Sequence, residues 1–314
     1  MISDTLEAKG IDLIVLLAPG KASFYPEYIP EHYNPEHKAT NNYEVYRKEI
    51  MQANIHLLDF NKWFRDMKAN SDYPLFPKTG IHWSMYGEML SIDSIIKYIN
   101  TIHTDNKIPE LLIRDIETSA NKMKGTDDDI EKGMNLLFNI KDLQMGYPQI
   151  EIQNDTSASP PKVLTVADSY YWSMFNWGLS KKAFNHGQFW YYNKQIFPES
   201  YKKPLNVIDI NIREEVEKND VVLLLFTDAN LHRFAFGFID QLYDSYFKSD
   251  KNSVSLKDKK EERIQLYIHA IKGTPEWIES IKKKAQERKI SLSEAIRKNA
   301  EYMVWRENNE NTNR

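Results

Sequence analysis

Residues 162–171 read Lys-Val-Leu-Thr-Val-Ala-Asp-Ser-Tyr-Tyr, and this stretch decides the fold. Its apolar, β-branched run Val163–Ala167 predicts a short buried strand. The strand stops at Asp168 and Ser169, and the aromatic residues that follow have a spacing compatible with a helix. A serine at such a strand-to-helix turn lies beside the free N–H groups of a helix N-terminus, which can hold an anion. Ser169 is therefore a candidate nucleophile with an oxyanion hole next to it.

A second stretch, residues 76–87, places one histidine after a Pro/Gly loop and before a predicted helix. It reads Phe-Pro-Lys-Thr-Gly-Ile-His-Trp-Ser-Met-Tyr-Gly. A nucleophilic serine needs a base within hydrogen-bond reach, and His82 is the best-placed candidate in the sequence. Taken singly, Ser169 could be an ordinary helix N-cap, and His82 could be a packed histidine beside Trp83. Their joint occurrence favours a Ser–His site.

Further apolar runs predict other strands of the same sheet. These runs are Ile11–Leu17, Ile55–Phe60, Val207–Ile210 and Asp220–Phe226. Their alternation with helical segments and short connections is typical of a doubly wound, mostly parallel α/β sheet. In such a sheet the carboxyl ends of the strands share one edge. We therefore expect four strand ends to lie at this edge, at Pro19, Asp59, Asp168 and Asp228.

The pattern divides the chain into two parts. Residues 1–248 carry the α/β alternation, with an irregular insertion at about 104–160, whereas residues 249–314 are charged and helix-periodic. The second part predicts a C-terminal helical extension that packs as an appendage. Within the insertion, Asp127–Asp129 invites a metal interpretation. Three consecutive acids point in different directions, so we favour acids that open a helix and complement its dipole, and we predict no metal site.

The amino-acid composition argues against several classes of partner and site. The 314 residues carry a net charge of −4 from 41 basic and 45 acidic residues that are well mixed, which argues against a nucleic-acid partner. The absence of cysteine excludes disulfides and thiolate metal sites. No apolar run approaches ~18 residues, so no membrane insertion is expected of this chain. The N-terminal residues do not read as a signal peptide.

Two motifs resemble those of a known family. Ala-Asp-Ser-Tyr at residues 167–170 resembles the Gly-Asp-Ser block of SGNH hydrolases, and Thr-Gly-Ile-His-Trp-Ser at residues 79–84 resembles the Asp-x-His-Trp block of the alginate O-acetyltransferase branch. In that branch the histidine block precedes the serine block, a circular permutation, and this sequence has the same order. The resemblance spans residues 10–240. It implies an α/β, flavodoxin-like or SGNH-type three-layer sandwich with a mostly parallel sheet, to which the C-terminal helical appendage is added.

One position departs from the family pattern. The acid of the family lies two residues before the histidine, where this sequence has Gly80. We consider Asp59 and Asp228, which end predicted strands, as replacement acids that orient His82. A backbone carbonyl, a Ser–His dyad without an acid, and a degraded site that binds without turnover are the alternatives. Asp168 is expected to anchor the turn of the serine.

The resemblance also implies further site residues. Its oxyanion hole would use the backbone N–H of Ser169 or Tyr170, with Asn230 as the matching asparagine and Gly187 as a weaker match for the glycine. An ordinary helix N-cap is the alternative for Asn230. For substrate binding we predict Lys21, Trp83, Tyr170 and Trp190. Aromatic faces suit sugar rings, although these aromatic residues could equally be core, and Lys21 could be a solvated loop residue.

The function implied by the resemblance is that of an O-acetyltransferase or acetylesterase that acts on a cell-envelope or extracellular polysaccharide without a cofactor. Its partners would be the polysaccharide, an acyl donor and a membrane-bound acyltransferase. Relatives are usually envelope proteins with an N-terminal anchor, so we expect a periplasmic or cell-envelope location, with an upstream leader missing here. The alternatives are a catalytically impaired carbohydrate-binding relative, or a scaffold of a polysaccharide modification or secretion complex.

Overall fold

The chain forms two compact units, Met1–Tyr246 and Phe247–Arg314. The computed structural model describes residues 1–33, 40–138, 140–153, 159–198, 205–248 and 256–310. Each unit has its own hydrophobic core. The predicted site lies in the first unit.

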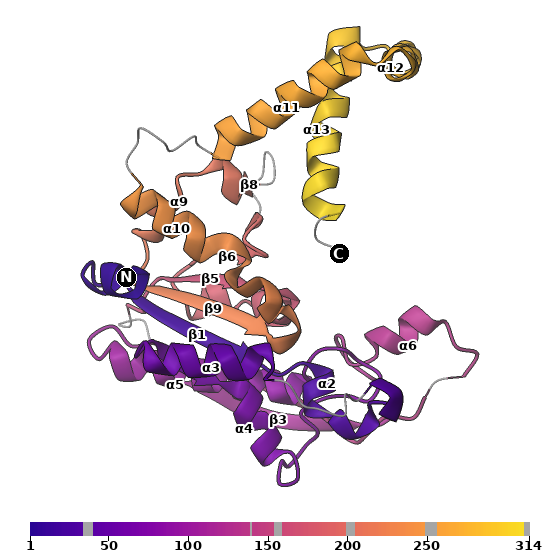
Figure 1. Ribbon diagram of the computed structural model, residues 1–314. Coiled ribbons are helices and arrows are strands. Elements are labelled where there is room, and N and C mark those ends of the chain that lie inside the picture. The colour runs from indigo at the N-terminus through magenta and orange to yellow at the C-terminus, as the bar shows by residue number, and fades with distance from the viewer. Residues whose placement is uncertain (34–39, 139, 154–158, 199–204, 249–255, 311–314) are drawn as a thin grey trace. The chain divides into compact units, whose positions relative to one another are not determined.

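A seven-stranded, mostly parallel sheet is the centre of the first unit, as predicted (Figure 1). Its strands, in spatial order, are β2 (His56–Asp59), β1 (Asp12–Ala18), β9 (Val221–Thr227), β5 (Val163–Ala167), β6 (Phe189–Tyr191), β7 (Gln195–Phe197) and β8 (Leu205–Asn206). The first five run parallel, β7 runs antiparallel to β6, and β8 runs antiparallel to β7. The pairing of Ala18 with Thr227 aligns the ends of β1 and β9 at one edge.

The prediction of a strand at Val207–Ile210 is wrong, because Val207–Asp209 forms a 3-10 helix, η4, directly after β8. The side-chain amide of Asn206 donates to the Asp209 carboxylate over 3.2 Å. Such a local side-chain bond stabilises a turn in competition with the ladder of a strand.

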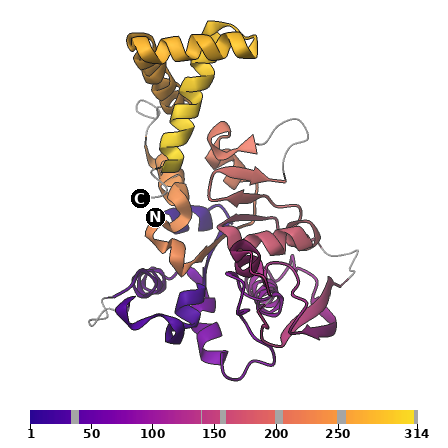
Figure 2. The same ribbon diagram turned by 90° about the vertical axis from the view of Figure 1, so that its right-hand side faces the viewer.

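Helices cover both faces of the sheet, which gives the predicted three layers (Figure 2). One face packs on α4 (Phe60–Met67), α5 (Met85–Ile102), α7 (Trp172–Trp177) and α8 (Leu179–Lys182). The other packs on α1 (Ile2–Glu7), α3 (Asn42–Gln52), α9 (Ile212–Val216) and α10 (Phe238–Phe247). Because successive side chains of a strand point to opposite faces, Ile14 and Leu16 join the first core and Val15 joins the second.

The insertion at about 104–160 is more regular than predicted. It contains an antiparallel pair, β3 (Leu111–Ser119) and β4 (Met145–Ile152), with α6 (Asp129–Met134) between the two strands. The N–H of Gln153 donates to the carbonyl of Glu110 over 2.8 Å, so the segment enters and leaves at neighbouring points. Residues 139 and 154–158 of the insertion lie outside the described part.

The second unit consists of α11 (Leu256–Gly273), α12 (Pro275–Arg288) and α13 (Leu292–Glu310). Pro275 lies in the first turn of α12, and the Ser291 hydroxyl accepts from the N–H of Glu294 at the start of α13; both features are typical of helix starts. Apolar residues from all three helices form a separate core that includes Ile271, Ile281 and Ile296. Within the described residues, no helix is long and apolar enough to cross a membrane.

Candidate active site

Ser169 lies at the carboxyl edge of the sheet, at the start of the short helix η3 (Ser169–Tyr171). The turn that presents it is fixed by Asp168, whose side chain is fully buried. The Asp168 carboxylate accepts hydrogen bonds from the Tyr170 N–H (3.0 Å), the Thr227 N–H (2.8 Å), the Thr227 hydroxyl (2.9 Å) and the Asn230 amide (2.8 Å). Burial raises the pKa of Asp168, and these four bonds act in the opposite direction. Asp168 therefore ties the serine turn to the end of β9.

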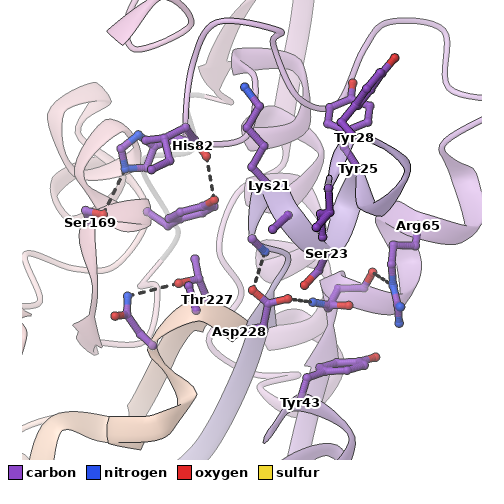
Figure 3. Close-up of a pocket in the computed structure, with 18 of the residues that line it drawn as sticks. Lys21, Ser23, Tyr25, Tyr28, Tyr43, Arg65, His82, Ser169, Thr227 and Asp228 are labelled. Atoms are coloured by element: carbon purple, nitrogen blue, oxygen red, sulfur yellow. Dashed lines mark hydrogen bonds between the residues drawn. The ribbon is translucent and has the colours of Figure 1, made fainter. Parts of the chain in front are cut away.

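His82 reaches Ser169 from the loop before α5 (Figure 3). Its Nε2 atom lies 3.1 Å from the Ser169 Oγ atom. The Tyr170 ring packs against the imidazole with 4.9 Å between ring centroids, and the Tyr170 hydroxyl donates to the Ile81 carbonyl over 3.1 Å. The residue after the serine thus fixes the backbone and the ring plane of the histidine.

The second imidazole nitrogen of His82 faces a carboxylate that the sequence analysis assigned to a helix start and not to the site. His82 Nδ1 lies 3.2 Å from the Asp129 Oδ2 atom, and the other Asp129 oxygen accepts the Ile81 N–H over 2.9 Å. Asp129 opens α6, as the dipole interpretation predicts, but it also contacts the histidine. A separation of 47 residues along the chain gives no local signal of this contact.

Neither Asp59 nor Asp228 contacts His82, so our prediction of these two acids needs correction. Asp59 caps α4 by accepting the Lys62 N–H, and its carboxylate also accepts from Tyr43 and Arg47. The Asp228 carboxylate accepts the Gly20 N–H over 2.9 Å and the Asn61 amide over 2.8 Å (Figure 3). Both acids lie at the predicted edge of the sheet, but their carboxylates accept hydrogen bonds from other backbone and side-chain donors.

A cavity of about 1110 Å³ opens beside Ser169 and His82. Lys21 lines it and donates from its ammonium group to the carbonyls of Lys78 and Gly80, over 2.6 Å each. Burial lowers the pKa of Lys21, and the negative charges of nearby aspartates oppose this shift. The lysine therefore clamps the histidine loop and is not simply a solvated loop residue.

Four other predicted residues have different surroundings from those expected. Trp83 and Trp190 are 1% and 0% exposed, so their rings belong to the core and offer no face to a ligand. Gly187 packs against the start of β5, where an added Cβ would lie 1.8 Å from the Val163 carbonyl oxygen, whereas Ser169 follows the end of that strand. Asn230 does line the cavity, but its amide donates to Asp168.

Tyr192 lines the cavity and was not among the residues that we predicted for catalysis. It follows β6 with a φ of +50°, a left-handed conformation that is uncommon for a tyrosine, and its N–H donates to the Ala167 carbonyl over 2.9 Å. Burial is the main factor that raises the pKa of Tyr192 to about 12, whereas its contact with the Ser169 hydroxyl lowers it. The turn thus holds a protonated phenol beside the candidate nucleophile.

Comparison with known proteins agrees with the sequence motifs. Residues 1–143 match the family model described as the SGNH hydrolase-like domain of the acetyltransferase AlgX. This part of the chain is similar to an AlgX-type SGNH hydrolase-like domain. The AlgX-type match includes His82 and Asp129 and ends before Ser169.

Individual relatives of the AlgX-type domain are distant. The probable alginate O-acetylase AlgJ of Pseudomonas putida is 24% identical over 119 residues, which is 38% of this chain and only 30% of that protein's length. The structure of the O-acetyltransferase domain of Pseudomonas putida AlgJ is 18% identical, with a TM-score of 0.45, over 78% of this chain and 86% of that one. Bacillus cereus PatB1 with a sulfonyl adduct is 14% identical, with a TM-score of 0.46, over 76% and 89%.

Proposed function

We propose that the protein is a serine O-acyltransferase or esterase in which Ser169 is the nucleophile and His82 the general base. The distance of 3.1 Å between Ser169 Oγ and His82 Nε2, beside an open cavity, is the observation that supports this function most directly. The match to an acetyltransferase-type domain supports the same reaction class.

The reaction would proceed in two halves. In the first, Ser169 Oγ attacks the carbonyl carbon of an acyl donor while His82 Nε2 takes the hydroxyl proton; the donor's leaving oxygen then departs with that proton, and an acyl-enzyme remains. In the second, a sugar hydroxyl or water gives its proton to His82 and attacks the acyl carbon. Ser169 leaves and recovers its proton.

Both halves pass through an oxyanion that needs hydrogen-bond donors. The Ser169 N–H at the start of η3 and the Tyr192 hydroxyl are the donors that we propose, because both lie at the serine. Asn230 and Gly187 are less suited, because the Asn230 amide is engaged by Asp168 and Gly187 packs at the start of β5.

For the acceptor we propose a polysaccharide of the cell envelope or the extracellular matrix. The name of the Pseudomonas putida relative, a probable alginate O-acetylase, supports this class, although it does not identify the polymer for this chain. Tyr25 and Tyr28, which line the cavity, offer aromatic surface to a sugar ring. A periplasmic or envelope location, an acyl donor and a membrane-bound acyltransferase partner are parts of the same proposal.

Ester cleavage with a matched serine control tests the nucleophile. Wild-type protein should release p-nitrophenol from p-nitrophenyl acetate, Ser169→Ala should reduce the rate to background, and Ser23→Ala should retain it. Ser23 lines the same cavity without a histidine partner in the described structure, so it controls for changes in cavity shape. A sulfonyl fluoride should modify Ser169 alone, as mapped by peptide mass. Equal release by wild type and Ser169→Ala would contradict the proposal.

The alternative is a relative that binds carbohydrate or acts as a scaffold without turnover. The missing acid at position 80 motivates this alternative. The carboxylate of Asp129 beside His82 argues against it. Polysaccharide binding without ester release and without sulfonyl labelling would favour this alternative.

A further inference from the structure

Residues 126–131 and Asp142 of the insertion contact the loop that carries His82. The Thr79 carbonyl accepts the N–H groups of Ile130 (3.0 Å) and Glu131 (3.3 Å). In return, the Thr79 hydroxyl donates to the Asp142 carboxylate over 2.7 Å, and its oxygen lies 3.2 Å from the Asp127 carbonyl oxygen. Asp142 also accepts the Thr79 N–H over 3.0 Å. Two separate parts of the insertion, residues 127–131 and Asp142, are therefore hydrogen-bonded to the histidine loop.

Asp129 is held in one orientation at the centre of this contact. One of its oxygens accepts the Ile81 N–H, and the other lies at His82 Nδ1. Both bonds involve adjacent residues of one loop, so the carboxylate and the imidazole move together. Its side chain is 31% exposed and that of His82 is 19% exposed, which leaves the pair partly shielded from water.

The insertion packs closely against Gly80 of the histidine loop. A Cβ atom at Gly80 would lie 2.5 Å from the Thr126 carbonyl oxygen, 2.8 Å from the Asp127 carbonyl oxygen and 2.7 Å from Pro77 Cγ. Two of these neighbours are backbone atoms, which cannot rotate away as a side chain can. Any side chain at position 80 would therefore displace the segment that ends at Asp129.

We infer that Asp129 performs the role that the family motif assigns to a residue two positions before the histidine, and that Gly80 is glycine because the segment carrying this relocated acid fills the space. The inference rests on the proposed function of Ser169 and His82. Asp129 does not reach the reacting atoms, so it is a positioning residue: it acts through the imidazole.

The donor and acceptor roles of Asp129 and His82 show which imidazole tautomer this positioning selects. An ionised carboxylate only accepts, so a bond between Asp129 and Nδ1 requires that Nδ1 carry the ring proton. Nε2 then has a free lone pair, and the Ser169 hydroxyl donates to it. This is the tautomer that a general base needs, and the same carboxylate stabilises the imidazolium formed in the reaction.

A double-mutant cycle on ester hydrolysis tests the link between positions 80 and 129. Asp129→Ala and the isosteric Asp129→Asn should each lower kcat by roughly 10²–10⁴-fold, the range in which serine hydrolases respond to loss of the acid. Gly80→Ala should lower kcat in the same direction, and adding it to Asp129→Ala should cause no further loss, because both changes remove one carboxylate. Asp128→Asn is the matched control, since Asp128 pairs with Lys132 and not with His82.

A spectroscopic measurement separates positioning from general damage and does not depend on turnover. In ¹⁵N-histidine-labelled protein, wild type and Ser169→Ala should show a downfield Nδ1–H proton resonance of His82, assigned by its absence in His82→Gln. Asp129→Asn, Asp129→Ala and Gly80→Ala should lose this resonance, whereas Asp128→Asn should keep it. Circular dichroism confirms that each variant is folded.

The outcomes separate the inference from the proposed function. If Asp129→Asn keeps both wild-type kcat and the Nδ1–H resonance, the assignment of Asp129 is wrong. Strictly additive losses from Gly80→Ala and Asp129→Ala would overturn the link between the two positions. If Ser169→Ala is as active as wild type, the proposed nucleophile fails, and the resonance alone still decides whether Asp129 holds the imidazole.

Discussion

Glu88 provides the sharpest stability test of the structure. It lies in the first turn of α5 and is 8% exposed. Burial is the main cause that raises the pKa of Glu88 from 4.5 to about 7; nearby Asp127 adds to the rise, and a hydrogen bond with Ser173 opposes it. The folded protein thus holds a proton on Glu88 that the unfolded chain gives up at lower pH.

The sign and size of the effect follow from linkage. A carboxyl group whose pKa is raised on folding favours the folded state below its unfolded pKa, and this contribution is lost as pH rises through the folded pKa. The window is therefore pH 4.5 to about 7. At ~1.4 kcal/mol for each tenfold change, the full loss is on the order of 3 kcal/mol. Glu88→Gln keeps the size of the side chain but cannot ionise.

Urea unfolding followed by tryptophan fluorescence at several pH values measures this difference. Glu88→Gln should equal wild type near pH 4.5 and exceed its free energy of unfolding by about 3 kcal/mol at pH 8. Asp127, whose pKa burial also raises to about 7, is present in both proteins, so its own burial cancels and the comparison reports Glu88 together with its repulsion from Asp127. Glu49→Gln, an exposed change in α3, is the control. A Glu88→Gln protein that follows the wild-type pH dependence would refute the reasoning.

Four further predictions concern the site and its support. Tyr192→Phe should lower kcat for p-nitrophenyl acetate by roughly 10²-fold, as loss of one oxyanion donor does, with an unchanged urea midpoint; an unchanged kcat would remove Tyr192 from the oxyanion hole. Asp168→Ala leaves four donors without their acceptor and should lower the free energy of unfolding by about 3–5 kcal/mol in urea titrations; a loss below about 1 kcal/mol would contradict its anchoring role. Gly80→Asp should lower ester hydrolysis although it restores the family motif, and a gain in rate would show that position 80 has room for an acid. A protein truncated after Tyr246 should still unfold cooperatively and cleave the ester, and failure to fold would show that the two units depend on each other.

The central strands were predictable because they are apolar along most of their length. β1, β5 and β9 are central or near-central and are covered by helices on both faces, so their sequences are mainly Leu, Val and Ile. Topology then places Ser169 and the end of β9 at one edge. His82 could be anticipated only together with Ser169, because neither residue has a distinctive neighbourhood of its own.

Other features could not be predicted, because they depend on contacts between distant segments. Asp129 reaches His82 only because the β3–β4 pair folds the insertion back over the histidine loop. Trp83 and Trp190 were assigned to the substrate because aromatic side chains suit a sugar ring as well as a core, and only burial distinguishes the two. Gly187 was placed at a strand end, but it packs against a strand start.

The β3–β4 ladder has a consequence for how the sequence around His82 can evolve. Because the inserted segment enters and leaves through paired strands, one insertion or deletion can add or remove it without breaking the parallel sheet. With Asp129 at His82, an acid at residue 80 is not needed, and the backbone of residues 126 and 127 leaves no room for one. Among relatives that carry the same segment, residue 80 and residues 126–129 should therefore change together, and a search for an acid two residues before the histidine would miss them.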